Sequence, residues 1–325
     1  MPRTWQAARP FALLACWCAA LASGRADAAS YTFVDLGGLP GYQDNGATGI
    51  NNEGQIVGVS AAYGPTSNSI LKRAFLYSNG TMTPVGEATA KWVSIGINDN
   101  GPTVYHWVPF ARQSVSWVND AGQAIEGHQL TSGGQSISLG DFYAIAINNH
   151  GEIAGMFHGA DRVIHPAIYQ DGKMTDLSKQ LNGDGDVAFA AYAINDRGDI
   201  LYSTSLGHGI RYADGMAQPL NFYPTGINNL GQVVGRDNAG RGVLYQDGIT
   251  TTLASLLPPS PVGLDKFSPE AINDAGQIVG GYLIDGYNHP FLLDPVPAPE
   301  PSTLVMLLLA GGGLGLRTAL RRLGP

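Results

Sequence analysis

A short pattern of apolar and polar positions recurs along the chain. Each copy places an apolar residue before Asn, then Asp or Asn, one variable residue and Gly, and an apolar pair follows, as in AINDAGQIVG at Ala271–Gly280. Asn and Asp at the start of a turn bond their own backbone two residues on, and Gly supplies the positive φ that a tight hairpin needs. The pattern therefore predicts strand, turn, strand at six places, whose first Asn residues are Asn51, Asn98, Asn148, Asn195, Asn228 and Asn273.

A second hairpin pattern alternates with the first. It is an apolar strand ending in Tyr, a polar-Gly turn and a further strand, as in RAFLYSNGTMTPVG at Arg73–Gly86 and HPAIYQDGKMTDL at His165–Leu177. Two hairpins give four short strands for every 33–50 residues, and a unit of that size must stack on its neighbours to bury its apolar face. The sequence predicts an all-β fold, a β-propeller of about six four-stranded blades, with a β-solenoid as the alternative.

Two further observations complete the predicted ring. A similar turn at Asn119 (VNDAGQAIEG) falls out of step, and we assign it to the second hairpin of its unit. The last unit ends at His289–Pro295 without a fourth strand, while Tyr31–Gly38, ahead of the first unit, resembles the missing strand. An N-terminal strand that completes the last blade would close the ring and remove two exposed sheet edges.

The repeats, of the form AIN-D-x-G-QIVG followed by HAF-x-Y-x-x-G-x-M-x-D-LG, resemble the HAF repeat of predicted extracellular bacterial proteins. The resemblance covers nearly all of Tyr31–Pro295 and recurs six times. It implies a secreted repeat protein and points to no particular reaction.

The N-terminal segment has the form of a secretory signal peptide. Arg3 and Arg9 precede an apolar run at Phe11–Leu21, and the small-residue sequence Ala-Asp-Ala ends at Ala28. This order predicts export, with cleavage after Ala28. The composition, with 44 Gly and only 14% charged residues, also fits an extracellular all-β chain, because average proteins are about 25% charged.

Both cysteines, Cys16 and Cys18, lie inside this segment. The mature chain therefore has neither a disulfide nor a thiolate nucleophile, and its stability must come from blade packing and ring closure. The letters LLAC ending at Cys16 are a weak match to a lipoprotein box, which the short preceding apolar run disfavours.

The C-terminal segment, residues 297–325, combines a Pro-Glu-Pro motif, fourteen uncharged residues and a basic tail. The uncharged run, Thr303–Leu316, would span roughly 21 Å as a helix, short of a ~30 Å hydrocarbon core unless flanking residues join it. The arginines would hold its end on the cytoplasmic side. The motif and tail residues are Pro299, Glu300, Pro301, Arg317, Arg321 and Arg322.

This segment resembles the PEP-CTERM sorting signal of Gram-negative bacteria. The resemblance implies recognition by an exosortase, a membrane protease-transferase, and delivery to the cell surface or extracellular matrix. A plain C-terminal membrane anchor is the alternative. The chain then divides into a signal peptide (1–28), a repeat body (29–296) and a sorting segment (297–325) with a short transmembrane helix.

Removal of both ends makes the protein more acidic. It takes away six of the 18 Lys and Arg but only two of the 26 Asp and Glu, which leaves a formal charge near −12. An acidic body of this kind disfavours nucleic acid and anionic lipid surfaces as partners. Exopolysaccharide is the candidate partner, and no motif indicates a cofactor.

Three of the seven histidines recur at one repeat position. They are His165, His208 and His289. A side chain that recurs once per blade indicates a structural role, such as a hydrogen bond to the backbone of a neighbouring blade.

One stretch, LNGDGDVAF at Leu181–Phe189, is a weak metal candidate. Asn182, Asp184 and Asp186 alternate like the start of a calcium loop, but the downstream Glu is missing, so a Gly-rich turn is the favoured interpretation. The chain holds no HExxH, GxSxG, Walker or CxxC signature.

Two units depart from the repeat at the position after the apolar pair. Four units carry Gly there, where we expect another backbone to approach closely; these are Gly58, Gly155, Gly235 and Gly280. The other two carry Tyr, and the first of them continues with His and Trp, with Trp92 and Trp117 nearby. Aromatic faces beside polar groups suit sugar rings, although aromatic side chains can equally fill a larger blade core. The candidate ligand-binding residues are Tyr105, His106, Trp107 and Tyr202.

These observations predict a secreted, sorted protein of the cell surface or matrix with a binding or structural role, glycan binding included. The alternative is a polysaccharide-active hydrolase or lyase with its site in the propeller channel, so the sequence leaves catalysis open. An inward cluster of Asp, Glu or His at one mouth of the channel would favour the enzyme. An aromatic-lined mouth with few carboxylates would favour the binder.

Overall fold

The recurring Asn pattern forms the turns of inner β-hairpins in the computed structural model, which describes residues 31–64, 70–89, 93–106, 117–181, 188–204, 209–258 and 267–296. At Asn51 the backbone N–H donates to the Gln55 carbonyl at 3.1 Å, and the Asn51 side-chain oxygen accepts the Gln55 N–H at 2.8 Å. Gly54 in the same turn has φ 73°, a conformation that favours glycine. The turn chemistry read from the sequence is therefore what reverses the chain.

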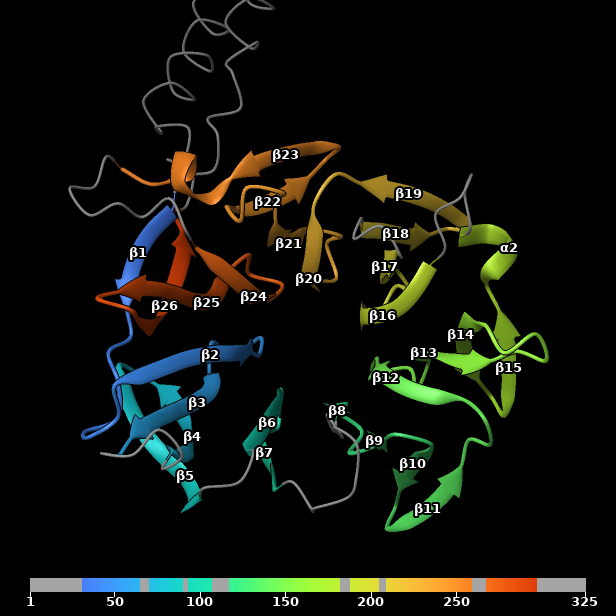
Figure 1. Cartoon of the computed structure of the whole chain (residues 1–325), viewed down its shortest axis with the longest axis horizontal. Coiled ribbons are helices and arrows are strands. Elements are labelled where there is room, and N and C mark those ends of the chain that lie inside the picture. Colours follow the sequence, from blue (N-terminus) through green and yellow to red (C-terminus); the bar gives the residue numbers. More distant parts are fainter. Residues whose placement is uncertain are drawn as a thin grey trace, which may run out of the picture. The chain divides into compact units, whose positions relative to one another are not determined.

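The hairpins pair into six four-stranded antiparallel sheets around a central opening (Figure 1), which confirms the predicted all-β propeller of about six four-stranded blades. The first of these sheets contains β2 (Asp44–Ile50), β3 (Ile56–Tyr63), β4 (Ile70–Ser78) and β5 (Thr81–Thr89). The next contains β8 (Trp117–Val118), β9 (Ala124–Glu126), β10 (Gln129–Ser132) and β11 (Gln135–Ser138). It is followed by β12 (Tyr143–Ile147), β13 (Ile153–His158), β14 (Ile164–Gln170) and β15 (Lys173–Asp176).

The chain continues around the ring in the same way. The fourth sheet contains β16 (Ala188–Ile194), β17 (Ile200–Thr204), β18 (Gly209–Ala213) and β19 (Met216–Leu220). The fifth contains β20 (Tyr223–Ile227), β21 (Val233–Arg236), β22 (Gly242–Gln246) and β23 (Ile249–Thr252). Two short helical segments, α2 (Ser178–Leu181) and a 3-10 turn (Leu253–Leu256), follow β15 and β23.

The N-terminal strand closes the ring. β1 (Tyr31–Asp35) is the outer strand of the last sheet, which also holds β24 (Ser268–Ile272), β25 (Ile278–Ile284) and β26 (Tyr287–Pro295). β1 pairs with β26 so that Tyr31 faces Pro295 and Asp35 faces Phe291. Figure 1 shows the blue first strand in the same sheet as the red last ones. The predicted closure by an N-terminal strand is confirmed.

A seventh, two-stranded sheet separates the first two four-stranded sheets along the chain. It consists of β6 (Val93–Asn98) and β7 (Gly101–His106). The Asn119 turn joins β8 to β9 and is thus the inner turn of its own sheet. Its assignment to a second hairpin is wrong. Although Asn119 follows Asn98 closely in the sequence, its turn belongs to the next four-stranded sheet, of which β8 and β9 form the inner hairpin.

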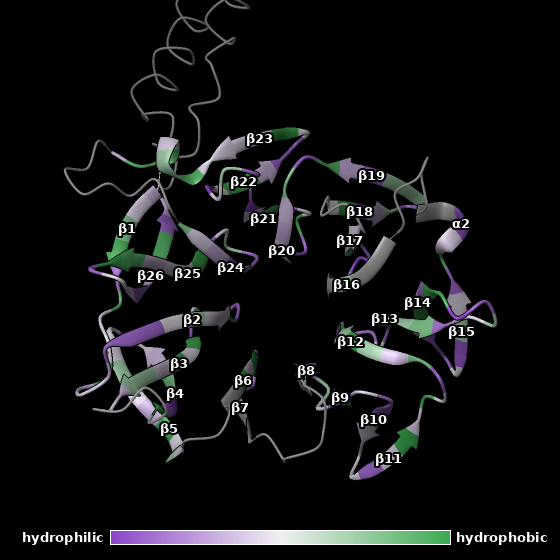
Figure 2. Ribbon diagram, viewed as in Figure 1, coloured by the Kyte–Doolittle hydropathy of each residue, from purple (hydrophilic) through white to green (hydrophobic). Residues whose placement is uncertain are grey.

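The core lies between neighbouring sheets. Leu201 of β17, for example, packs with Val233 of the next sheet and with Phe222, which lies just before that sheet. Outer strands such as β15 are exposed along their length, and hydrophilic residues are prominent there (Figure 2). The close approach expected at the repeat glycines is confirmed, because a Cβ at these positions would lie 2.0–2.1 Å from a carbonyl oxygen of the inner strand. The glycines are Gly58, Gly155, Gly235 and Gly280.

Candidate functional site

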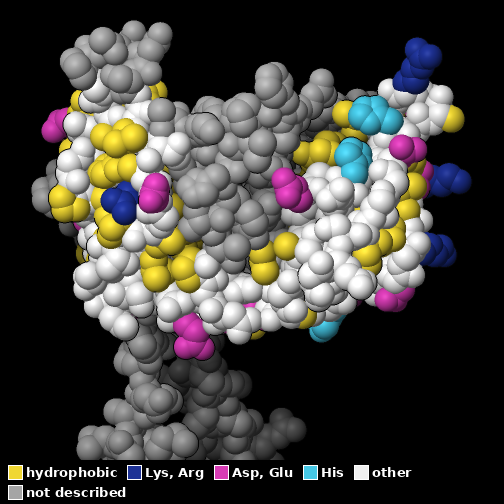
Figure 3. Space-filling view, turned by 90° about the horizontal axis from the view of Figure 1, so that it is seen from below, with side chains coloured by type: hydrophobic (Ala, Val, Ile, Leu, Met, Phe, Trp, Pro, Cys, Tyr) yellow, Lys and Arg dark blue, Asp and Glu magenta, His cyan; other side chains and the backbone are white. Residues whose placement is uncertain are grey.

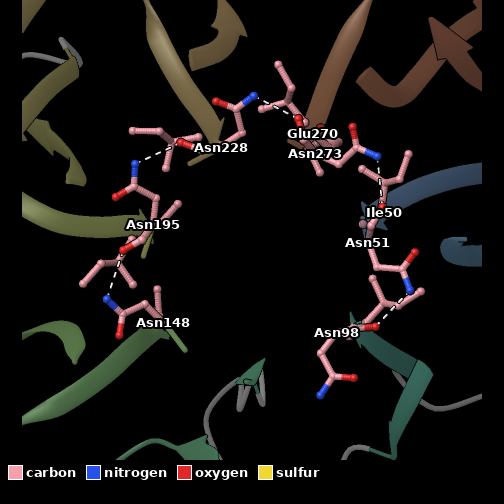
Figure 4. Close-up of a pocket in the computed structure, with 18 of the residues that line it drawn as sticks. Ile50, Asn51, Asn98, Asn148, Asn195, Asn228, Glu270 and Asn273 are labelled. Atoms are coloured by element: carbon pink, nitrogen blue, oxygen red, sulfur yellow. Dashed lines mark hydrogen bonds between the residues drawn. The ribbon is translucent and has the colours of Figure 1, made fainter. Parts of the chain in front are cut away.

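The seven inner turns are linked into a closed ring of hydrogen bonds at one end of the central channel. Figure 4 shows the part of this ring that runs from Asn148 through Asn273 and Asn51 to Asn98. In each turn the Asn side-chain N–H donates to the backbone carbonyl of the Asn in the next turn, at 2.7–3.0 Å. The last of these bonds, from Asn273 to Asn51, joins residues at opposite ends of the repeat body. All but one of these Asn side chains are buried with exposures of 3–4%. The ring residues are Asn51, Asn98, Asn119, Asn148, Asn195, Asn228 and Asn273.

A second ring lies one residue further along each turn. Each backbone N–H donates to the side-chain oxygen Oδ1 of the equivalent residue in the next turn, at 2.8–3.0 Å. Its members are Asn52, Asp99, Asp120, Asn149, Asp196, Asn229 and Asp274. This mouth of the channel therefore carries four carboxylates, and each accepts a hydrogen bond from a neighbouring turn. Asp and Asn suit this position because both offer an oxygen at the same reach.

The channel contains a cavity of about 670 Å³, a volume typical of small-ligand sites. Residues of both rings line it together with apolar side chains. Directly before each ring Asn stands a branched apolar residue, and these seven residues line the cavity. They are Ile50, Ile97, Val118, Ile147, Ile194, Ile227 and Ile272. We call these seven residues the isoleucine belt.

Two charged side chains and a tyrosine interrupt this lining on neighbouring blades. Glu270 lies on β24, while Arg236 on β21 and Tyr223 on β20 are paired across their strands. Burial raises the pKa of the Glu270 carboxyl, and the positive charge of Arg236 offsets part of that rise. Thr225 joins the two blades, because its hydroxyl donates to the Pro269 carbonyl at 2.8 Å. The channel thus holds an acidic group whose pKa responds to the charge of a basic group on the neighbouring blade.

The candidate residues chosen from the sequence do not gather at this site. Tyr202 on β17 is fully buried, and burial raises the pKa of its hydroxyl well above the ordinary range. An extra irregularity between Ala188 and Ala190 in the facing strand β16 accompanies this large side chain at a repeat-glycine position. For Tyr202 the structure supports the core-filling alternative. Tyr105 and His106 belong to β7 in a different sheet.

The remaining sequence candidates lie outside the described residues. They are Trp107, the three calcium candidates Asn182, Asp184 and Asp186, the cleavage residue Ala28, and the sorting residues Pro299, Glu300, Pro301, Arg317, Arg321 and Arg322. Within the described part of the chain, no three His, Asp or Glu side chains are grouped so as to hold a metal ion. No helix in that part has the length and apolar character needed to cross a membrane.

His165 corrects the expected role of the recurring histidine. Its ring contacts Asp161 at 3.0 Å through Nε2 and the Ser178 hydroxyl at 2.7 Å through Nδ1, so its partners are side chains of its own blade. Ser178 in turn donates to Asp176. Because the Ser178 proton is committed to a carboxylate and the side chain is buried, this cluster holds α2 against the sheet instead of presenting a nucleophile.

Figure 3 shows no large face of a single charge on the side that it draws. Among the described residues there, acidic and basic side chains lie between apolar and uncharged ones. The channel, with its two rings and the Glu270 and Arg236 pair, is therefore the best-defined candidate site of the described residues.

Fold and channel together define a β-propeller. No protein-family model and no curated protein matches the chain. Similar solved structures include a hypothetical protein from Leishmania major, at 12% identity over 85% of this chain and 94% of that one, with a TM-score of 0.35. The β-propeller domain of the Trilobed protease from Pyrococcus furiosus is 10% identical over 79% and 85%, with a TM-score of 0.33. A Pyrococcus horikoshii acylaminoacyl peptidase is 10% identical over 81% and 53%, with a TM-score of 0.44.

Proposed function

We propose that this chain is an exported propeller of the cell surface or extracellular matrix, with a binding or structural role toward exopolysaccharide. The signal-peptide form of residues 1–28 and the Pro-Glu-Pro segment at residues 297–325 support export and sorting by an exosortase. The HAF-like repeats also support an extracellular location. The near −12 charge of the body favours a neutral polymer over an anionic one.

One observation carries the binding role. The carboxylates at the mouth of the channel each accept a neighbouring backbone N–H at Oδ1, so this oxygen of each Asp helps to hold the ring together. An acid or base in catalysis needs a group free to exchange its proton with a substrate. The mouth therefore suits a rigid binding frame, with the cavity as the place for a ligand.

The enzyme alternative has two observations in its favour, and the first is the cluster of four carboxylates at the mouth of the channel. The second is Glu270, because a carboxyl of raised pKa in a cavity is a candidate general acid. A glycoside hydrolase needs two carboxyl groups, about 5–10 Å apart, on either side of the scissile bond. The four Asp of the mouth are held in the ring by the hydrogen bonds described above, so we place this alternative second.

Export and sorting are tested by the intact mass of the protein from its native host. We expect a chain that starts at Ala29 and lacks Thr303–Pro325. Replacing the motif glutamate, Glu300→Ala, should leave the tail in place and retain the protein in the membrane fraction, while the control Thr303→Ser should be processed normally. A wild-type protein that keeps Arg321 would contradict sorting and support the alternative, a plain C-terminal membrane anchor.

Binding and catalysis are separated by one experiment on the processed protein. Exopolysaccharide from the producing strain is mixed with it, and both sedimentation with the polymer and release of reducing ends are measured. Co-sedimentation without new reducing ends supports the binding role. Release of reducing ends that Glu270→Gln abolishes would support the enzyme instead. Trp107→Ala tests the aromatic candidates, and loss of binding without a change in melting temperature would assign them to the ligand.

A further inference from the structure

We propose that the channel contains a subsite for one neutral sugar residue, formed by Glu270, Arg236 and Tyr223. This inference rests on the proposed binding function and adds the place and the chemical class of the ligand. It differs from the aromatic candidates on β7, since it uses side chains of β20, β21 and β24.

The first observation is that Glu270 departs from the repeat. It stands three residues before a ring Asn, a position that holds Thr, Ile, Ser or Tyr ahead of the other six ring Asn residues. At this position Thr48 donates its hydroxyl to a carbonyl of the paired strand at 3.5 Å, and Thr225 donates its hydroxyl to the Pro269 carbonyl of the next blade at 2.8 Å. An ionised carboxylate has no proton to donate, so Glu270 cannot take over that structural bond.

The second observation is that neither charge of this pair has a hydrogen-bond partner in the described part of the protein. Among the described residues, only the field of Arg236 acts on Glu270. A partly buried carboxylate without hydrogen bonds lowers the stability of a fold. A ligand that supplies those bonds would account for keeping it in the channel.

The third observation is complementarity to a sugar ring. Vicinal hydroxyls can donate to a carboxylate and accept from the planar fork of a guanidinium at the same time. Tyr223 is 42% exposed and lines the same cavity, and an aromatic ring suits the C–H face of a sugar. The isoleucine belt adds apolar side chains to the lining of the same cavity.

Charge then selects the class of ligand. An anionic ligand would be repelled by Glu270 and the four Asp of the mouth. A neutral hydroxyl-rich ligand avoids this repulsion and can hydrogen-bond both Glu270 and Arg236. Because a 670 Å³ cavity exceeds a single sugar ring, the bound residue can be the end of a longer chain.

The test uses the processed protein from the producing strain and its variants Glu270→Gln and Arg236→Met. The probes are glucose, galactose, mannose, N-acetylglucosamine and their common disaccharides, with glucuronic acid and glycine as charged comparisons. Binding is followed by ligand-observed NMR titration. The matched controls are Glu53→Gln in an exposed turn and Arg162→Met in an exposed loop.

We expect at least one neutral sugar to bind the wild type, and both channel variants to weaken it fivefold or more. The controls should stay within twofold. Glu270→Gln should also melt at the same temperature as the wild type or higher, because it removes a partly buried charge that has no hydrogen bond. A lower melting temperature would assign Glu270 a structural role and overturn the subsite, as would binding restricted to glucuronic acid or glycine, or no binding of any probe.

The test of the sugar subsite can fail or succeed independently of the test of exopolysaccharide binding. Polymer binding that is unchanged in Glu270→Gln would overturn the subsite and leave the exported binding protein standing. Sugar binding lost in Glu270→Gln, with no sedimentation of the wild type with exopolysaccharide, would support the subsite and overturn the matrix polymer as partner.

Discussion

Asp199 and Glu270 are both acidic side chains removed from water, yet their surroundings move their pKa values in opposite directions. Burial alone would raise the pKa of Asp199, but hydrogen bonds from Arg197, Arg211 and Asn195 outweigh it and hold the pKa below its usual range. Glu270 lies near one Arg without a hydrogen bond among the described residues, and burial raises its pKa. Hydrogen-bond donors decide the sign for Asp199, and their lack among the described residues leaves burial to decide it for Glu270.

This difference distinguishes a carboxylate that stabilises the fold from one that is a candidate for ligand binding. A buried carboxylate with three donors stabilises the fold, and removing a donor leaves a charge without compensation. A carboxylate that meets the same desolvation without donors destabilises the fold, and such groups concentrate where a ligand or a reaction uses them. The Asp199 cluster fits the first description and Glu270 fits the second.

Both carboxylates depend on the closed ring for their surroundings. Loss of ring closure should therefore lower the stability of the protein more than any of the substitutions below. Deleting Tyr31–Asp35 removes the outer strand of the last sheet and exposes the edge of β26. Loss of the buried Tyr31 alone costs about 3–5 kcal/mol, and a domain of this size loses roughly 2–4 °C per kcal/mol. We expect the melting temperature to fall by more than about 10 °C. The exposed Thr32→Ala is the control, and an unchanged melting temperature in the deletion would contradict closure.

The paired carboxylate should respond strongly to loss of a donor. Arg211→Met leaves Asp199 with Arg197 and Asn195, and we expect the free energy of unfolding to fall by about 2 kcal/mol, somewhat less than the complete breaking of a buried pair. Urea unfolding measures the change. Lys173→Met on the exposed strand β15 is the control. A change below about 0.5 kcal/mol would show that the Asp199 cluster is a solvated surface pair.

The pH dependence of Asp199 sharpens the contrast. A carboxyl whose folded pKa is lowered contributes stability above its unfolded pKa of about 3.9, and loses it as the pH falls through the folded value. Asp199→Asn should therefore be less stable than the wild type at pH 7, and the difference should shrink below about pH 4. Melting curves of the two proteins between pH 3 and 7 test this, and a constant difference would mean that the charge of Asp199 contributes nothing.

The smallest effect should come from Glu270→Gln, with the opposite sign. A carboxyl of raised pKa binds its proton more tightly in the folded state, so the wild type gains stability as the pH falls through that pKa. The variant should be more stable by up to about 1 kcal/mol at pH 7, and the gain should vanish below about pH 4.3. Melting curves between pH 3 and 7 measure this gain in stability. A variant that is less stable than the wild type at pH 7 would show that Glu270 stabilises the fold.

Local turn chemistry explains why much of the fold could be read from the residues. The Asn and Gly of each inner turn act within five residues, and the Gly of the second strand reports the close approach of the neighbouring carbonyl. Asn119 shows the limit, because spacing along the chain does not say which turns meet at the axis. Tyr202 shows another, since an aromatic residue in place of Gly reads equally as surface or core until its neighbours are known.

The candidate site was hidden for a related reason. Glu270 and Arg236 belong to different repeats, and neither forms a motif with its sequence neighbours. Comparing the inner strands position by position shows Glu270 as the one charged residue three places before a ring Asn. This departure from the repeat is visible in the sequence, but only the structure shows that Glu270 lines the channel.

The sequence alone determined the hairpins, the four-stranded blades and the strand that closes the ring, because each rests on contacts between residues close in the chain or on a repeated pattern. Tertiary structure decided the rest. Ring bonds such as Asn273 to Asn51 join separate blades, and the pairing of Glu270 with Arg236 exists only where two blades meet at the axis. A side chain's partners across the channel depend on how many blades the ring contains, and that number follows from the packing of whole sheets.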